Sequence, residues 1–496
     1  MFQRSYTLIK TLHEESKKDL GSVIDKDYIV KGKVRFLRTQ AKRMFMHIYD
    51  GSHPEQLQCM IDDDKFPGVR SSVLDDLSTG ATVVLTGTIV KSPAKGQLIE
   101  MVVKMCKVIG KVKDRETYIP TIKQATYEVL REHQDVRAYD RSMQAINRVR
   151  SMLHKFVEEF FVKVEGLRLD PNIVTKADCE GAGETFVITT LLKEDDVKSI
   201  PLVDKTTQID FSQDFFTSKA YLTVSSQLQL EALCHFMGLV YTMNPSFRAE
   251  KSRTSRHLAC FTHLEWEIPY IELKDLMDFS EDLTRYCFER LLSEGKLELA
   301  ELQTFCPYSK GMTDKLLSFI AQPYARISYD EAIDIVKRDG DKIIEKFKGD
   351  VKELPKWGDD LGSFCERYIC ECVTLRPTFV YNYPRELKSF YMKQNPSYVV
   401  DEVERHTVQG CDLLIPGLGE LIGSSIREDD YDTLMQEMQR RKMADIPWYT
   451  DLRKNGSVPT GGAGLGFDRL VSVCTMTEGN IREVVPFYVT YQDCQY

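Results

Sequence analysis

Basic side chains gather in one short segment between two β-type stretches. Residues 247–258 read Phe-Arg-Ala-Glu-Lys-Ser-Arg-Thr-Ser-Arg-His-Leu, so three Arg, one Lys and one His fall within ten residues. Arginine binds phosphate oxygens in pairs and stays charged, which makes this segment a candidate phosphate-binding hairpin loop. A solvated basic loop without a ligand is the alternative, and the segment alone does not decide between the two.

The stretch that follows, Leu258 to Glu267, alternates with the period of two that is typical of a strand. One face carries Phe261, His263, Glu265 and Glu267, and the other carries Leu258, Cys260, Thr262, Leu264 and Trp266. A ring that can stack on a base, and acids that can bind amines, indicate a site beside the basic loop. The alternative is a half-exposed strand with ordinary charges.

Two segments nearer the C-terminus add further candidates. Residues 461–469 read Gly-Gly-Ala-Gly-Leu-Gly-Phe-Asp-Arg; clustered glycines allow close backbone approach, and Arg469 in the next helical turn can reach a phosphate. Their spacing fits neither a P-loop nor a dinucleotide fingerprint. Residues 411–428 predict an apolar strand with Asp412, Glu420 and Arg427 near its ends, and such carboxylates are ligands that suit Mg²⁺.

The first part of the chain predicts a small barrel. β-type runs at 28–35, 43–49, 81–90 and 97–108 indicate about five strands, as in an oligonucleotide-binding (OB) fold. Residues 1–115 hold 20 Lys and Arg against 14 Asp and Glu, although the whole chain has a net charge of -9. A basic module on an acidic body indicates contact with a polyanion, unless the imbalance is a chance feature of the surface.

The remainder predicts an α+β domain. We expect an N-terminal extension at 1–27, the barrel at 28–115, a polar linker at 116–138 and a catalytic domain at 139–496. That domain begins with a long amphipathic helix near Tyr139, in which apolar residues recur every three or four positions. Residues 270–350 are mostly helical in pattern and predict an insertion or a peripheral layer.

Composition indicates the compartment of the protein and the state of its cysteines. No apolar run reaches the length of a membrane span, and the N-terminus lacks the pattern of a secretory signal. The 13 Cys include no C-x-x-C pair, and the nine His never take metal-ligand spacing. We therefore expect a cytoplasmic protein with reduced cysteines and no structural zinc.

Together these segments resemble the class II aminoacyl-tRNA synthetases, and within them the asparaginyl/aspartyl group. The Arg-rich hairpin is similar to the second motif of that class, and Gly464 to Arg469 to the third. The helix ending near Phe161, with Pro171 beyond it, resembles the first motif, which builds the dimer interface in the family. The resemblance runs from about residue 28 to the C-terminus and implies a class II catalytic domain, an antiparallel sheet flanked by helices, behind an OB-type barrel.

The finer resemblance is to asparaginyl-tRNA synthetases. Residues 177–184 look like the mobile loop over the amino acid, in which Glu180 corresponds to a residue that helps to bind the α-ammonium group. Residues 221–231, which include Gln227, are also similar, and aspartyl enzymes carry Lys where this chain has Leu230. Glu265 can accept a hydrogen bond from an amide but would repel a second carboxylate, and Arg427 would donate to the side-chain oxygen.

The resemblance implies ATP-dependent formation of asparaginyl-adenylate and transfer of asparagine to tRNA(Asn) by a homodimer. Fixed cations would stabilise the charge that develops on the phosphates. The expected ATP-binding residues are Arg248, Glu250, Arg256, His257, Phe261, Glu420 and Arg469, with Arg248 and Arg469 closest to the chemistry. Mg²⁺ would bind Glu420, with Asp412 as the weaker candidate. Phe45, Gln58 and Glu100 match the family's anticodon-reading positions in the barrel.

Three positions depart from the family pattern. Cys260 stands where the family has Glu, Thr460 where it has His, and Ala463 where it has Phe. An aspartyl-tRNA synthetase, possibly non-discriminating, is one alternative, against which Leu230 and Glu265 argue. An asparagine synthetase lacks the barrel, and a catalytically inactive paralogue that only binds RNA or a partner is opposed by retention of Arg248, Glu420 and Arg469.

Overall fold

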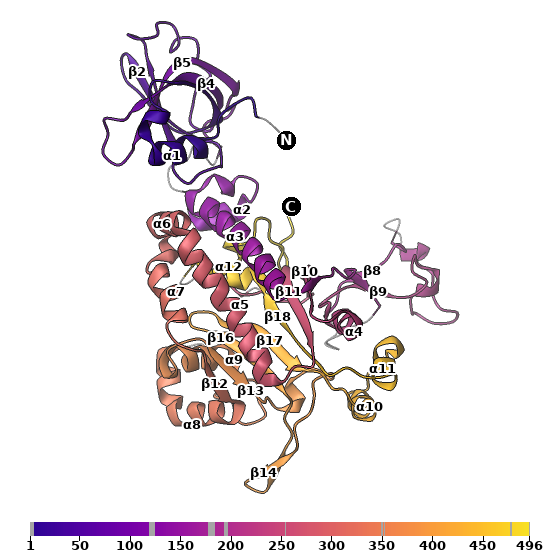
Figure 1. Ribbon diagram of the computed structural model, residues 1–496. Coiled ribbons are helices and arrows are strands. Elements are labelled where there is room, and N and C mark those ends of the chain that lie inside the picture. Colours follow the sequence, from indigo (N-terminus) through magenta and orange to yellow (C-terminus); the bar gives the residue numbers. More distant parts are fainter. Residues whose placement is uncertain are drawn as a thin grey trace. The chain divides into compact units, whose positions relative to one another are not determined.

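The computed structural model describes residues 4–118, 125–176, 184–192, 197–252, 254–348, 351, 353–476 and 479–495 (Figure 1). The chain divides into two compact units, residues 1–145 and 146–496. No helix in the described part of the chain has the length and apolar character that a bilayer crossing requires.

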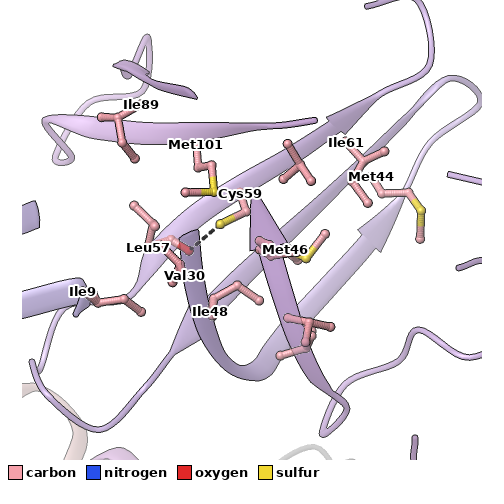
Figure 2. Close-up of a cluster of buried hydrophobic side chains, with 14 of the residues drawn as sticks. Ile9, Val30, Met44, Met46, Ile48, Leu57, Cys59, Ile61, Ile89 and Met101 are labelled. Carbon is pink, nitrogen blue, oxygen red and sulfur yellow. Dashed lines mark hydrogen bonds between the residues drawn. The ribbon is translucent and has the colours of Figure 1, made fainter. Parts of the chain in front are cut away.

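The N-terminal unit contains a closed barrel with the strand order β1-β2-β3-β5-β4. The strands are β1 (Asp27–Thr39), β2 (Arg43–Tyr49), β3 (Leu57–Asp62), β4 (Thr82–Lys91) and β5 (Ile99–Gly110). Along β4, buried residues alternate with half-buried ones, so Val83, Leu85 and Ile89 point into the barrel. Figure 2 shows this core, to which Ile9 of α1 (Ile9–Lys18) contributes.

Two glycines allow barrel strands to approach one another closely. A Cβ at Gly32 would lie 2.5 Å from the carbonyl oxygen of Tyr49, and one at Gly87 would lie 2.3 Å from that of Val102. Side chains at these positions would push the strands apart, as is usual where a strand glycine faces another backbone. The sequence pattern does not single out β3, although it predicts the number of strands.

The described part of the stretch 116–138, predicted as a polar linker, includes a short helix, α2 (Tyr127–Glu132). Thr126 caps it, because its Oγ1 accepts a hydrogen bond from the backbone N–H of Val129 at 3.4 Å. The long helix predicted from Tyr139 is α3 (Arg141–Lys163) and begins two residues later.

The second unit is built on an eight-stranded sheet with the order β12-β13-β16-β17-β18-β11-β10-β6. Its strands are β6 (Leu167–Arg168), β10 (Val240–Phe247), β11 (Cys260–Pro269), β12 (Ala325–Ser328), β13 (Thr378–Tyr381), β16 (Gly410–Ile415), β17 (Gly419–Ile426) and β18 (Thr460–Gly466). The six central strands are antiparallel, whereas the pairs β12–β13 and β6–β10 at the two edges are parallel.

The second unit also contains most of the described helices. They are α3, α4 (Gln227–Met237), α5 (Leu273–Glu294), α6 (Lys296–Phe305), α7 (Met312–Ile320), α8 (Tyr329–Lys346), α9 (Gly362–Tyr368), α10 (Tyr431–Arg440), α11 (Pro447–Lys454) and α12 (Phe467–Thr475). Trp266 of β11 lies against Phe161 of α3 and Phe279 of α5, with ring centroids 6.2 and 5.9 Å apart. Helices α3 and α5 therefore cover the Trp266 face, and the Glu265 face is left for the site.

Two small sheets complete the second unit: β7 (Val174–Thr175), β8 (Val187–Ile188) and β9 (Ala220–Leu222) form one, and β14 (Tyr398–Val400) with β15 (Val403–Arg405) the other. The predicted fold class, an OB-type barrel followed by a sheet with flanking helices, is confirmed. One local prediction is wrong: Asp412, Glu420 and Arg427 do not share a strand. Asp412 lies on β16, Glu420 on β17 and Arg427 directly after it, because the turn at 416–418 folds the segment into a hairpin.

Candidate active site

Four neighbouring strands place polar and glycine residues in a row on one face of the large sheet. Asp412 of β16 pairs with Gly423 of β17, Gly423 pairs with Gly464 of β18, and Gly464 pairs with Glu265 of β11. Residues paired across strands point to the same face. The two glycines therefore form a flat floor between two carboxylates, and the glycine-rich motif is the strand that supplies half of this floor.

Strand β18, which supplies Gly464 to this floor, requires glycine because side chains of β11 lie close above it. A Cβ at Gly462 would lie 1.8 Å from Oε2 of Glu267, and a Cβ at Gly464 would lie 2.5 Å from Nε2 of His263. The glycine-rich motif therefore leaves the space that the side chains of Glu267 and His263 occupy.

The first of two adjoining cavities, here named the basic cavity, contains all seven residues predicted to bind ATP. Its lining comprises Arg248, Glu250, Arg256, His257, Leu258, Phe261, His263, Glu420, Leu421, Gly464, Gly466, Asp468, Arg469 and Ile481. They come from the loop between β10 and β11, from β11 itself, from β17 and from α12. The predicted hairpin is therefore present, and it faces the glycine floor.

Three arginine side chains gather in the basic cavity. The Arg248 guanidinium lies 5.5 Å from the centre of the Phe261 ring, and Arg469 donates to the backbone carbonyl of Glu420 at 2.8 Å. Burial, with help from neighbouring cations, lowers the pKa of Arg256 and that of His257. Such crowded cations are costly on their own and favour a polyanionic ligand.

The second cavity, here named the paired-charge cavity, contains three of the four residues predicted to bind asparagine: Gln227, Glu265 and Arg427. Leu230 of α4 also lines it and is buried, which leaves an apolar side chain where aspartyl enzymes would have a cation. Glu180 lies outside the described residues. The two cavities share Arg248, His263, Glu420 and Gly464, so they meet at this point.

Arg427 is already held by a carboxylate. Its Nε and Nη2 donate to Oε1 and Oε2 of Glu267 at 2.8 and 2.7 Å, and its Nη1 donates to Ser425 Oγ at 2.6 Å. Both partners are buried. Burial opposes the charge on Arg427, but Glu267 outweighs it and raises the pKa of the guanidinium. The pair fixes Arg427 in one orientation.

Glu265 is held at the start of α4. Its carboxylate accepts hydrogen bonds from Ser225 Oγ and from the backbone N–H of Ser226, the latter at 3.0 Å to Oε2. His263 Nδ1 lies 3.5 Å from Oε1. These contacts fix the carboxylate in the cavity wall, so Glu265 is positioned to accept hydrogen bonds from a donor in the cavity.

The two predicted metal ligands converge over the glycine floor. A Cβ at Gly423 would lie 3.2 Å from Glu420 Oε1 and 3.7 Å from Asp412 Oδ1. Burial opposes ionisation of Glu420, yet Arg469, Lys388 and Arg248 hold its pKa below the usual value. Asp412 instead accepts from Lys388 Nζ at 2.5 Å. Hard oxygen atoms around an open position suit Mg²⁺, with Glu420 the less neutralised of the two.

The sequence prediction missed several residues of this region. Glu267 was placed on the right face as an acid that could bind an amine, but its pairing with Arg427 was not predicted, and neither Lys388 nor Glu366 of α9 was assigned to the site. Burial, followed by the nearby Glu420 and Asp412, raises the pKa of Glu366 to about 8. No local spacing connects Glu366 or Lys388 with β16 and β17, because only the folded chain brings them together.

None of the three departures from the family pattern lines the basic cavity. Cys260 pairs with Phe247 at the start of β11, is half-buried, and lines neither cavity. Ala463 is buried opposite Trp266 in the strand register and lines the paired-charge cavity. Thr460 is fully buried at the start of β18. The described residues that face the basic cavity are therefore unaffected by these substitutions.

In the barrel, the three predicted anticodon-reading residues lie on neighbouring strands. Gln58 of β3 donates from Nε2 to Oε2 of Glu100 on β5 at 2.9 Å. Phe45 lies on β2, two residues before His47, which pairs with Gln58. The structure thus joins Gln58 and Glu100 directly and places Phe45 diagonally across from Gln58.

Comparison with known proteins agrees with this architecture. Residues 126–490 match the family described as tRNA synthetases class II (D, K and N), and residues 28–115 match the OB-fold nucleic acid binding domain. The asparagine–tRNA ligase of Hahella chejuensis is 38% identical over 487 residues, covering 97% of this chain and 98% of that protein. That of Yersinia enterocolitica is 38% identical over 471 residues, 94% of this chain and 95% of that protein.

Solved structures give the same result. Asparaginyl-tRNA synthetase from Pyrococcus horikoshii, complexed with asparaginyl-adenylate, has a TM-score of 0.78 at 30% identity and covers 98% of this chain and 99% of its own. The chain belongs to the class II tRNA synthetase family. Within that class it falls among the asparagine–tRNA ligases, as the sequence predicts, and it is therefore a ligase; the aspartyl alternative is not favoured.

Proposed function

We propose that this chain activates asparagine with ATP and transfers it to tRNA(Asn), with ATP in the basic cavity and asparagine in the paired-charge cavity. The observation that carries the proposal is the junction of the two cavities at Arg248, His263, Glu420 and Gly464. The carboxylate of an amino acid and the α-phosphate of ATP must meet at one point, and two separate cavities with a common wall provide it.

In the basic cavity, Arg248 binds the α-phosphate, and Arg256, His257 and Arg469 bind the β- and γ-phosphates. Phe261 stacks on adenine, with Arg469 on the other face of the base, and Glu250 helps to place the nucleotide. Glu420, assisted by Asp412, holds Mg²⁺, which when bound neutralises phosphate charge. No side-chain nucleophile is required for this step, because positioning and fixed charge supply the rate enhancement.

In the paired-charge cavity, Glu265 accepts a hydrogen bond from the amide NH₂ of asparagine, and Arg427 donates to the amide oxygen. Gln227 and Glu180 bind the α-ammonium group. Aspartate would bring a second carboxylate against Glu265, and no cation stands at position 230 to compensate.

Amino-acid-dependent ATP–pyrophosphate exchange tests the proposal. We expect exchange with asparagine and at least roughly 10²-fold less with aspartate, because one wrong charge in a closed pocket costs several kcal/mol. Equal exchange with aspartate would contradict the proposed selectivity, and no exchange with either amino acid would contradict the activity. Phe45, Gln58 and Glu100 are the proposed anticodon contacts, so Gln58→Ala should weaken charging of tRNA(Asn) and leave exchange unchanged.

We also propose a homodimer formed through α3, β6 and α4. Val162, Leu167 and Phe236 in these elements are 71%, 44% and 85% exposed, and β6 is an edge of the large sheet. Exposed apolar side chains beside an open strand favour self-association. Sedimentation should show a dimer that Phe236→Asp converts to a monomer, and a monomeric unmodified chain would exclude the proposed dimer.

The 12 cysteines among the described residues are free thiols. We propose that the protein functions in the cytoplasm, where cysteines stay reduced.

A further inference from the structure

The exposed face of β11 orders its side chains along the path from one cavity to the other. Phe261 lines the basic cavity, Glu265 lines the paired-charge cavity, and His263 between them lines both. Alternate residues of a strand lie about 7 Å apart. Under the proposed function, His263 therefore lies where the carboxyl carbon of asparagine and the α-phosphate of ATP react.

Hydrogen bonding determines which nitrogen of His263 faces the ligands. Nδ1 lies 3.2 Å from Ser246 Oγ and 3.5 Å from the Glu265 carboxylate, so the proton belongs on Nδ1. Nε2 then carries a lone pair and lies above Gly464, the glycine common to both cavities. Within the described residues, no hydrogen-bond donor to Nε2 is present.

The ring is neutral. Burial lowers the pKa of His263, Arg248 and Arg469 lower it further, and Glu265 and Glu420 act in the opposite direction. A neutral acceptor cannot stabilise negative charge on a phosphate. A neutral Nε2 can only accept a proton or a hydrogen bond from a ligand. The two reaction steps differ in whether the nucleophile at this junction carries a proton.

Only the second reaction step presents such a proton on the nucleophile. In the first step, a carboxylate attacks phosphorus and pyrophosphate leaves, with no proton transferred. In the second step, a ribose hydroxyl of the terminal tRNA nucleotide attacks the carbonyl carbon of the adenylate. A carbon–oxygen ester bond forms, the bond from that carbon to the phosphate oxygen of AMP breaks, and the hydroxyl proton must be accepted.

We propose that His263 is the general base of the transfer step, with Nε2 accepting the proton of the attacking ribose hydroxyl and then giving it to the leaving AMP phosphate or to water. The inference rests on the proposed function. Ser246 and Glu265 orient the ring through Nδ1, and Glu265 stabilises the imidazolium that forms.

Single-turnover kinetics with His263→Gln test the inference. Glutamine can accept a hydrogen bond where Nε2 lies but cannot take up a proton. We expect pyrophosphate exchange and the asparagine KM to stay within about twofold, while transfer from the isolated adenylate complex to tRNA(Asn) slows about 10²- to 10³-fold. The wild-type transfer rate should fall as the pH is lowered and the imidazole becomes protonated, and the variant should lose this dependence.

His406→Gln, at a half-buried histidine outside both cavities, is the matched control and should transfer at the wild-type rate. Normal transfer by His263→Gln would overturn the inference. So would an equal loss of exchange and transfer, or a rise of the asparagine KM alone, because these results assign His263 to the first step or to amino-acid binding. Absence of exchange in the wild-type chain would instead contradict the proposed function itself.

Discussion

The two cavities differ in how their charges are arranged before any ligand arrives. In the basic cavity, Arg248, Arg256 and Arg469 line the same space, and the distances from Arg248 to Glu250 and from Arg469 to the Glu420 carboxylate are 3.9 and 3.5 Å. In the paired-charge cavity, Arg427 lies against Glu267 and Lys388 against Asp412 at 2.5 to 2.8 Å.

This difference matches the charge of the proposed ligands. A nucleotide triphosphate compensates crowded cations, so placing several arginines together in this cavity increases the free energy gained on binding. Asparagine has a neutral side chain, and an unpaired arginine would favour aspartate. Pairing Arg427 with Glu267 keeps its geometry and cancels its net charge, so that selection depends on hydrogen-bond direction.

The largest expected effect follows from removal of one cation of the basic cavity. Arg248→Gln should lower asparagine-dependent exchange by about 10³-fold, because a fixed charge is lost where the transition state becomes more negative. Lys251→Gln removes a charge from an exposed position of the same loop and should retain most of the activity. Equal losses in the two variants would show that the net charge of the loop matters and that the position of Arg248 does not.

Breaking the buried pair should act on stability as well as on binding. Glu267→Gln leaves the Arg427 charge buried without a counter-charge, and we expect the free energy of unfolding to fall by about 3 kcal/mol and the asparagine KM to rise. Denaturant unfolding and exchange kinetics measure the two effects. The control is Glu294→Gln, which breaks the more exposed pair with Arg290 and should cost less than about 1 kcal/mol.

The stability of the fold near Glu420 and Asp412 should respond to pH through Glu366. Its pKa of about 8 exceeds the usual value because of burial and then Glu420 and Asp412, so the folded chain keeps a proton that an unfolded glutamate releases at lower pH. The stability contributed by this proton is complete in acid and is lost as the pH rises through about 8. Glu366→Gln should remove this loss, and its stability relative to wild type should rise by about 3 kcal/mol between pH 5 and 8.

Glu371, five residues further along, provides the opposite case. Burial opposes its ionisation, but Lys346 and Arg367 hold its pKa below the usual value. Its contribution is present at neutral pH and is lost as the pH falls, so Glu371→Gln should destabilise the chain at pH 7. Thermal unfolding of both variants across the pH range measures the contrast, and parallel curves would contradict it.

The sequence predicted the basic cavity more completely than the paired-charge cavity, for a physical reason. Five of its seven predicted residues lie between Arg248 and Phe261, where loop and strand periodicity suffice to place them. Glu267 carries no local sign that it pairs with Arg427, 160 residues away. Glu366 and Lys388 are likewise defined by contacts with β16 and β17 that only the folded chain makes.

Two local predictions show the limits of pattern alone. Residues 411–428 were interpreted as one strand because the apolar run continues through Pro416 and Gly417, which in fact form the turn of a hairpin. The glycine-rich stretch is a central strand although glycine disfavours strands, since its neighbours on β11 need the space that a side chain would take. In both cases tertiary contacts decide the local structure.

The smallest expected effect separates the two proposed metal ligands. Lys388 already neutralises Asp412, whereas Glu420 meets Arg469 only at 3.5 Å through its side chain. Glu420→Gln should therefore raise the Mg²⁺ concentration needed for half-maximal exchange about tenfold, because a charged hard ligand is lost. Asp412→Asn should raise it about twofold, because the lost charge was largely compensated by Lys388. Mg²⁺ titration of exchange at saturating ATP and asparagine measures both. The reverse order would mean that the metal lies on the Lys388 side of the glycine floor. It would also mean that pairing with Lys388 does not weaken Asp412 as a metal ligand.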